Sequence, residues 1–281
     1  MKLLFIGNCT FRDDTDSRVC NPFKPLRGEM RDADAIIMTL RGNITKKKDL
    51  SEVQSVGEQL VSLKRLMPNV PIIVDYKNED LFTGNKNGKN DTLKFLTKHG
   101  FIYTSQVIRP LLYGTLCIFS CIEDRLADRN TTNYSVPIEL DVPNQITLSY
   151  ISYIKSYVLP LRTVIVNLRI KSYSGIRLPT RALTFSKLLI ECGVDIVHIH
   201  ASWSKPLDIC KSYKNGIIIC GLGELINCRP PRRRFGPITS DLCTVNTVSK
   251  YFVSRSVDKK TVNDCVIPKS LGKQRHGIHP Y

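Results

Sequence analysis

Two histidines one residue apart stand at the end of a short apolar run, where side chains could do acid–base or metal chemistry. The run is Ile196–Ile199, which contains His198 and is followed directly by His200. A run of this kind is typical of a buried parallel strand, and ligands of open α/β sheets bind at the carboxyl ends of such strands. The pattern therefore places His200 at a candidate ligand-binding edge. His198, on the same strand face, could pair with His200 but is more simply a core or supporting residue.

A helix before this strand has to fix its position. Residues 180–192 carry apolar side chains at roughly helical spacing, and Gly193 can form the tight turn into the strand. Further strands are expected at residues 3–6, 33–40, 70–74, 101–110, 116–122, 163–168, 217–220 and 245–253. Further helices are expected at residues 50–67, 91–99 and 146–158. The second of these should be capped by Asn90 or Asp91 and end at Gly100. Residues 123–143 are expected to form a loop or insertion. This alternation predicts a layered α/β domain.

The chain is strongly basic, with 41 Lys and Arg against 25 Asp and Glu and a net charge of +16 over 281 residues. Basic clusters occur at Lys46–Lys48 and Arg232–Arg234, and the last quarter of the chain is especially rich in Lys and Arg. A polyanion such as nucleic acid, an acidic polymer or an anionic membrane surface would suit this charge. A solvated basic surface is the simpler explanation, and we favour it. We expect one domain at residues 1–253 and a loosely ordered basic tail at residues 254–281.

Ten cysteines without an export signal predict reduced thiols and a cytoplasmic location. The N-terminal apolar run, Leu3–Ile6, is too short for a signal peptide, and no run is long enough to cross a bilayer. The cysteines lack zinc-finger spacing, and neither a P-loop nor a nucleophile elbow is present.

Several strand-end segments follow one another with a characteristic spacing. They are Phe5–Asn8, Ala33–Arg41, Lys77–Glu79 with Asp91–Leu96, Val164–Arg169, Cys192–Trp203, Tyr213–Gly216 and Gly223–Ile226. In this order they resemble the capsule-synthesis protein CapA family, the poly-γ-glutamate capsule type, from residue 1 to about residue 252. The resemblance implies a calcineurin-like metallophosphoesterase fold, which is a β-sandwich flanked by helices. It also implies a centre at the strand ends where one or two divalent cations activate water and hold a phosphate.

The same resemblance identifies positions where this chain departs from the family. Six positions that carry metal-binding side chains in the family carry other residues here: Asn8, Thr39, Arg41, Glu79, Arg169 and Trp203. The remaining donors are Asn78 and His200, with weaker oxygen donors at Glu79 and Glu224. A guanidinium group repels a divalent cation and cannot lose its charge. Arg41 and Arg169 therefore predict a lost metal centre and no cofactor.

We therefore expect a divergent CapA-like protein, non-catalytic because its metal centre is lost, that binds an anionic ligand. Its expected binding residues are Arg41 and Arg169, with Asn8 and Trp203 beside them. An equally simple alternative is that the two arginines pair with Glu79 or Glu224 and fill the vacated cation positions.

Two other functions remain open at this point. In the first, an active metal-dependent phosphoesterase has rebuilt its site around Asn78, Glu79, His200 and Glu224, with a single Mn, Fe or Zn ion, and His200 and Asn78 are then the candidate catalytic residues. In the second, weaker one, the basic C-terminal quarter binds nucleic acid.

Overall fold

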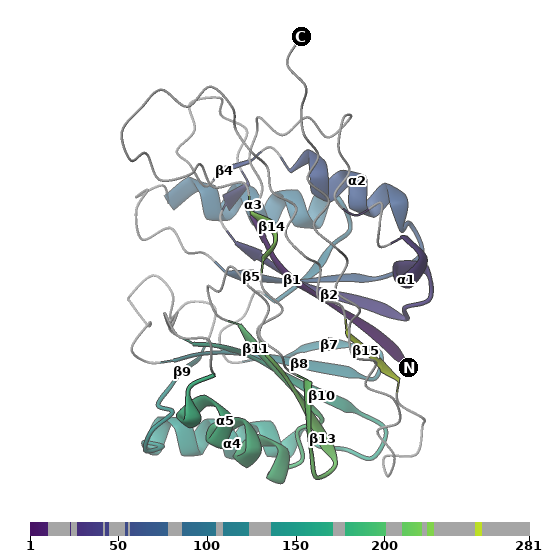
Figure 1. Ribbon diagram of the computed structural model, residues 1–281. Coiled ribbons are helices and arrows are strands. Elements are labelled where there is room, and N and C mark those ends of the chain that lie inside the picture. The colour runs from purple at the N-terminus through teal and green to yellow at the C-terminus, as the bar shows by residue number, and fades with distance from the viewer. Residues whose placement is uncertain are drawn as a thin grey trace, which may run out of the picture.

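Figure 1 shows four layers in the order helices, sheet, sheet, helices. The computed structural model describes residues 1–10, 23, 27–41, 43–44, 54–55, 57–77, 86–104, 109–123, 136–170, 178–200, 210–220, 224–227 and 251–254. Every structural statement below concerns these residues.

The first sheet is built around the N-terminal strand. Its order is β14 (Glu224–Asn227), β1 (Lys2–Thr10), β2 (Ala35–Arg41), β5 (Ile72–Lys77) and β6 (Ile102–Tyr103), and all of these pairs are parallel. The first half of β1 also pairs with β15 (Tyr251–Ser254), which runs antiparallel to it. A separate two-stranded pair joins β3 (Asn43–Ile44) to β4 (Gln54–Ser55).

The second sheet has a parallel centre and antiparallel edges. Its order is β12 (Cys210–Tyr213), β13 (Gly216–Cys220), β11 (Ile196–His200), β10 (Thr163–Arg169), β8 (Leu116–Glu123) and β7 (Leu111–Tyr113). Strand β9 (Val136–Ile138) pairs with the second half of β8. The strands β13, β11, β10 and β8 are parallel, so their carboxyl ends meet at one edge.

Helices cover the outer face of each sheet. The helices α1 (Arg27–Arg31), α2 (Glu58–Leu66) and α3 (Lys86–Lys98) lie over the first sheet. The helices α4 (Gln145–Ser156) and α5 (Thr180–Glu191) lie over the second. Each outer face therefore has its own apolar core. Among the described residues no helix is both long enough and apolar enough to span a membrane.

The two inner faces pack against each other to form a third core. Strand residues alternate between the faces of a sheet, so every second residue points to the opposite sheet. The first sheet contributes Leu3, Phe5, Ala35, Ile37 and Ile73, and the second contributes Leu116, Ile118, Ile165, Ile196, Ile217 and Ile219. Because both faces of each sheet are covered, the central strands are apolar on both sides.

The turn before β11 fixes where the two histidines lie. Gly193 adopts a φ of 98°, a value that L side chains rarely tolerate. Two residues later the buried Asp195 accepts a hydrogen bond through Oδ2 from the backbone N–H of Val164, at 2.8 Å. This bond ties the start of β11 to β10 and thereby sets the register of the strand that ends at His200.

The predicted α/β fold class, two sheets flanked by helices, is confirmed, and so are the helix at residues 180–192 and the strand that ends at His200. The helix expected at residues 50–67 is wrong in its first half, because Gln54–Ser55 forms a strand and Gly57, with a φ of 75°, starts the helix there.

Other expected boundaries also move. Helix α3 begins at Lys86, so Asn90 and Asp91 lie inside the helix and do not cap it. Strand β5 continues past Val74 to Lys77, because its residues keep pairing with β2. The expected loop at residues 123–143 contains strand β9. Residues 255–281 lie outside the described residues, so the basic tail and its boundary stay a prediction.

Candidate functional site

The inner faces of both sheets change from apolar to polar toward the carboxyl ends of their strands. We call the residues at this level the buried polar layer: Thr39, Asp75, Ser120, Asn167, His198 and His200, each at most 6% exposed. Register places them side by side within each sheet, since Thr39 pairs with Asp75 and Asn167 pairs with both Ser120 and His198. The candidate site therefore begins directly above the apolar core between the sheets.

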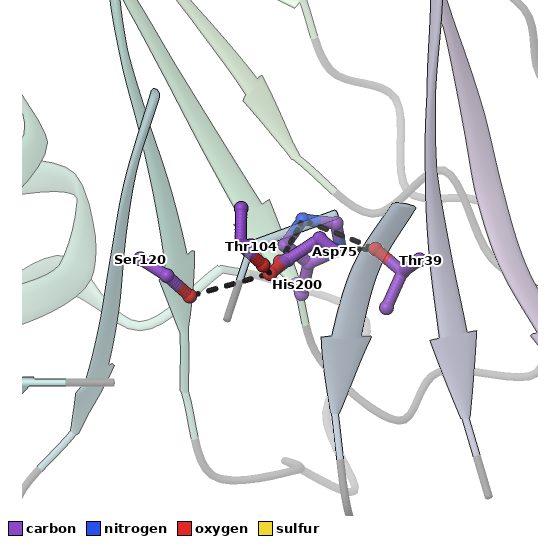
Figure 2. A network of polar contacts seen from close by, with 5 residues as sticks. All are labelled: Thr39, Asp75, Thr104, Ser120 and His200. Carbon is purple, nitrogen blue, oxygen red and sulfur yellow. Dashed lines mark hydrogen bonds and ion pairs between the residues drawn. The ribbon is translucent and has the colours of Figure 1, made fainter. Parts of the chain in front are cut away.

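Asp75 is the buried carboxylate of this layer, and its two oxygens face different groups. Oδ1 accepts hydrogen bonds from the hydroxyl of Thr104 at 2.8 Å and from the hydroxyl of Ser120 at 3.3 Å. Oδ2 lies 3.8 Å from Nε2 of His200, an ion pair when the imidazole is protonated. Figure 2 shows these contacts, with Ser120 and His200 coming from the second sheet and Asp75 from the first.

His200 is held from a second side as well. Its Nδ1 lies 2.8 Å from Oγ1 of Thr39, a contact that again joins the two sheets (Figure 2). The ring of His198 lies 3.8 Å from the ring of His200, measured between centroids, and it also contacts the ring of Phe5 in an edge-to-face arrangement at 5.0 Å. His198 is thus a core residue that packs against His200, as expected from the sequence.

Asn167 differs from the rest of the layer in its contacts. Its side chain is fully buried, and neither Nδ2 nor Oδ1 has a hydrogen-bond partner within the described part of the chain. Its strand neighbours on the inner face are Ile165 toward the core and Arg169 toward the edge.

Basic residues follow the buried polar layer at the strand ends. Arg41 comes two positions after Thr39 in β2, Lys77 two positions after Asp75 in β5, and Arg169 two positions after Asn167 in β10. Arg41 and Lys77 are register partners, and Arg169 is the register partner of His200. Arg169 is half-buried. Three strand ends thus carry a basic residue at the level just beyond the buried layer.

The structure brings several of the predicted site residues to one edge. Asn8 pairs with Glu224 on one side and with Thr39 on the other, which places both Asn8 and Glu224 beside the strand end that carries Arg41. His200 and Arg169 lie at the matching edge of the second sheet. The remaining predicted residues, Asn78, Glu79 and Trp203, lie outside the described residues, as do the basic clusters at residues 46–48 and 232–234.

Sequence reasoning missed Asp75, Ser120 and Asn167. A strand expected to end at Val74 left Asp75 in a loop, although Ile73 and Asp75 are two residues apart and therefore share the inner face. Ser120 and Asn167 lie in strands that were expected, but nothing in the local pattern distinguishes a site residue from a satisfied polar core residue.

The described residues do not fit a divalent cation. A catalytic metal of this kind needs about three protein ligands together with an open position. Among the described residues no group of three His, Cys, Asp or Glu side chains is arranged to hold a metal ion. In addition, Oδ1 of Asp75 is engaged by two hydroxyls, and Nδ1 of His200 is engaged by Thr39.

No protein-family model matches the sequence, and no curated protein matches it. Among solved structures, the chain is similar to a novel phosphatase from Mycoplasma pneumoniae, with 13% identity, a TM-score of 0.51 and coverage of 94% of this chain and 91% of that one. It is also similar to a hypothetical protein from Thermus thermophilus, with 10% identity, a TM-score of 0.49 and coverage of 90% and 92%. The likeness to the phosphatase supports a metallophosphoesterase-like fold, and at this identity it speaks to the fold alone.

Proposed function

We propose that this protein is a divergent, CapA-like member of the metallophosphoesterase-like folds that binds an oxyanion without a metal ion. The binding site lies at the carboxyl ends of the two sheets, immediately beyond the buried polar layer. Its positive charge comes from the strand-end residues Arg41, Lys77 and Arg169.

The register of β10 against β11 is the observation that carries this proposal. It sets the half-buried Arg169 beside His200. The resemblance to the CapA family implies a metal-binding side chain at the position of Arg169. An arginine presents a rigid fork of N–H donors that matches phosphate and carboxylate oxygens, and its charge persists at every physiological pH. An anion rather than a cation is therefore the ligand that suits this edge.

The chemistry of the layer below agrees with a binding role. The one carboxylate described there, Asp75, accepts hydrogen bonds from two hydroxyls through Oδ1 and faces Nε2 of His200 through Oδ2, so both of its oxygens face groups of the protein. The anion's charge is then matched by the strand-end basic residues.

Isothermal titration with inorganic phosphate at low ionic strength tests the proposal. Wild-type protein should bind phosphate, and Arg169→Gln should weaken binding about tenfold or more, because a charge-assisted hydrogen bond is lost. Arg65→Gln is the matched control, since Arg65 is exposed on α2 and its loss removes the same charge away from the site. An equal loss in both variants would show that binding follows net charge alone, and no binding by wild-type protein would refute the proposal.

The likeness to a phosphatase favours a second candidate function. A metal-dependent phosphoesterase would need a site rebuilt around His200, Glu224, Asn78 and Glu79. Metal analysis of the purified protein separates the two proposals: stoichiometric Mn, Fe or Zn, with phosphoesterase activity that a chelator abolishes, would establish the hydrolase and exclude the metal-free binding protein.

A further inference from the structure

We propose that Asn167 makes this site select oxyanions that carry a proton over oxyanions that are fully ionised. This inference rests on the proposed anion-binding function and names the residue that sets its specificity. The selected class includes hydrogen phosphate and singly ionised phosphate monoesters, and the rejected class includes sulfate.

The position of Asn167 points its side chain toward the site. Ile165, two residues earlier, packs in the core between the sheets, so Asn167 lies on the same inner face. Its register neighbours in the sheet are Ser120 and His198, both members of the buried polar layer. One step further toward the edge on this face is Arg169. Asn167 therefore lies on the inner face directly below the strand-end arginine, and in this proposal it forms the floor of the site.

The hydrogen-bonding capacity of Asn167 is unused within the described part of the chain. The side chain is 0% exposed, and neither its amide nitrogen nor its amide oxygen has a partner there. A buried amide left without partners is costly, so such a group in a folded protein calls for a specific explanation. A ligand at the floor of the site supplies one.

An amide constrains the chemistry of that ligand because it both donates and accepts. Nδ2 donates hydrogen bonds, Oδ1 accepts them, and Arg169 only donates. A hydrogen phosphate ion can accept from Arg169 and from Nδ2 while its own hydroxyl donates to Oδ1. Sulfate has only acceptors near neutral pH and would leave Oδ1 buried without a partner. A site that offers an acceptor to a ligand hydroxyl discriminates strongly against the analogue that lacks the hydroxyl.

Titration calorimetry of the full chain with phosphate and with sulfate at the same ionic strength tests the inference. Phosphate should bind about tenfold or more tightly than sulfate. Methyl phosphate gives an independent comparison, because it loses its last proton at a pH of about 6 whereas inorganic phosphate retains one above that value. The affinity for methyl phosphate, relative to phosphate at each pH, should therefore fall as the pH rises through that range.

Two variants assign the preference to Asn167. Asn167→Leu removes the hydrogen-bond donor and acceptor at similar side-chain volume, so the preference for phosphate should disappear while sulfate binding persists. The variant should be no less stable than wild-type protein, because no hydrogen bond within the protein is lost. Asn167→Asp keeps an acceptor and should keep the preference.

The possible failures differ in what they reject. Equal affinity of wild-type protein for phosphate and sulfate would overturn the inference and leave the proposed function standing. Binding of neither anion would reject both. An Asn167→Leu variant that unfolds more easily and still prefers phosphate would show that the amide serves the fold, for example through a buried water, and would overturn the inference.

Discussion

Thr39 and His200, 161 residues apart in the sequence, meet across the two sheets with Oγ1 and Nδ1 separated by 2.8 Å. Thr39 belongs to β2 in the first sheet and His200 ends β11 in the second. Both side chains are buried, at 1% and 6% exposure. The contact therefore joins the sheets at the level where their apolar core ends and the candidate site begins.

Replacing Thr39 by Val should destabilise the protein, because it keeps the shape but leaves His200 without its hydroxyl partner. The free energy of unfolding should fall by about 1–3 kcal/mol, measured by urea unfolding. Thr39→Ser keeps the hydroxyl and is the matched control, with a smaller loss expected. If the Val variant unfolds at the same urea concentration as wild-type protein, the contact does not contribute to stability.

Gly193→Ala should destabilise the turn that leads into β11. An added Cβ would lie 2.7 Å from Cγ1 of Val158, and the φ of 98° is strained for any L side chain. We expect a loss of about 2–3 kcal/mol in the free energy of unfolding, measured by urea unfolding.

Gly100→Ala provides the comparison for Gly193. Gly100 has a φ of 68° but nothing within 4 Å of an added Cβ, so only the backbone cost of about 1–2 kcal/mol applies. Equal losses in the two variants would show that the clash with Val158 relaxes without cost.

The buried ion pair between Arg181 and Glu123 should matter far more than a surface pair. Nη2 of Arg181 lies 2.9 Å from Oε1 of Glu123, whose side chain is 2% exposed. Arg181→Met would leave that carboxylate buried without its cation, and we expect a loss of about 3 kcal/mol in chemical unfolding experiments.

The pair between Lys214 and Glu191 is the exposed control for this ion pair. Its atoms approach to 2.6 Å, but the side chains are 58% and 41% exposed, so Lys214→Gln should change stability little. A comparable loss in both variants would contradict the role assigned to burial.

Stability should decline in alkaline solution partly because of Cys117. Burial raises the pKa of this thiol from 9.0 to about 11. Between these values the unfolded chain gives up the proton and the folded chain keeps it, so the free energy of unfolding falls as the pH rises. The contribution of Cys117 is a loss of about 1 kcal/mol by about pH 10.

Urea unfolding of wild-type protein and Cys117→Ala at about pH 7 and pH 10 measures this contribution. The variant should lose less stability between the two pH values than wild-type protein does, whatever its stability at neutral pH. An identical decline would mean that the thiol of Cys117 titrates normally in the fold. Burial also raises the pKa of Tyr150, which adds to the decline at still higher pH in both proteins.

Local sequence was enough to predict the unit that carries the histidines. The helix at residues 180–192, the turn at Gly193 and the strand ending at His200 follow from apolar periodicity and one glycine, which are local properties. The alternation of such units also predicted the α/β fold class. The same local rules failed at Asp75, because a charged residue inside a strand looks like the start of a loop until its pairing with Thr39 is known.

The sequence by itself therefore determined the α/β fold class and the unit of helix, Gly193 turn and strand, and it placed His200 at a strand end. Only the tertiary structure decided that Thr39, Asp75, Ser120 and Asn167 share one buried layer with His200. Strand register and the packing of two sheets bring these residues together, and both depend on contacts between positions far apart in the chain. A local pattern contains no record of such contacts.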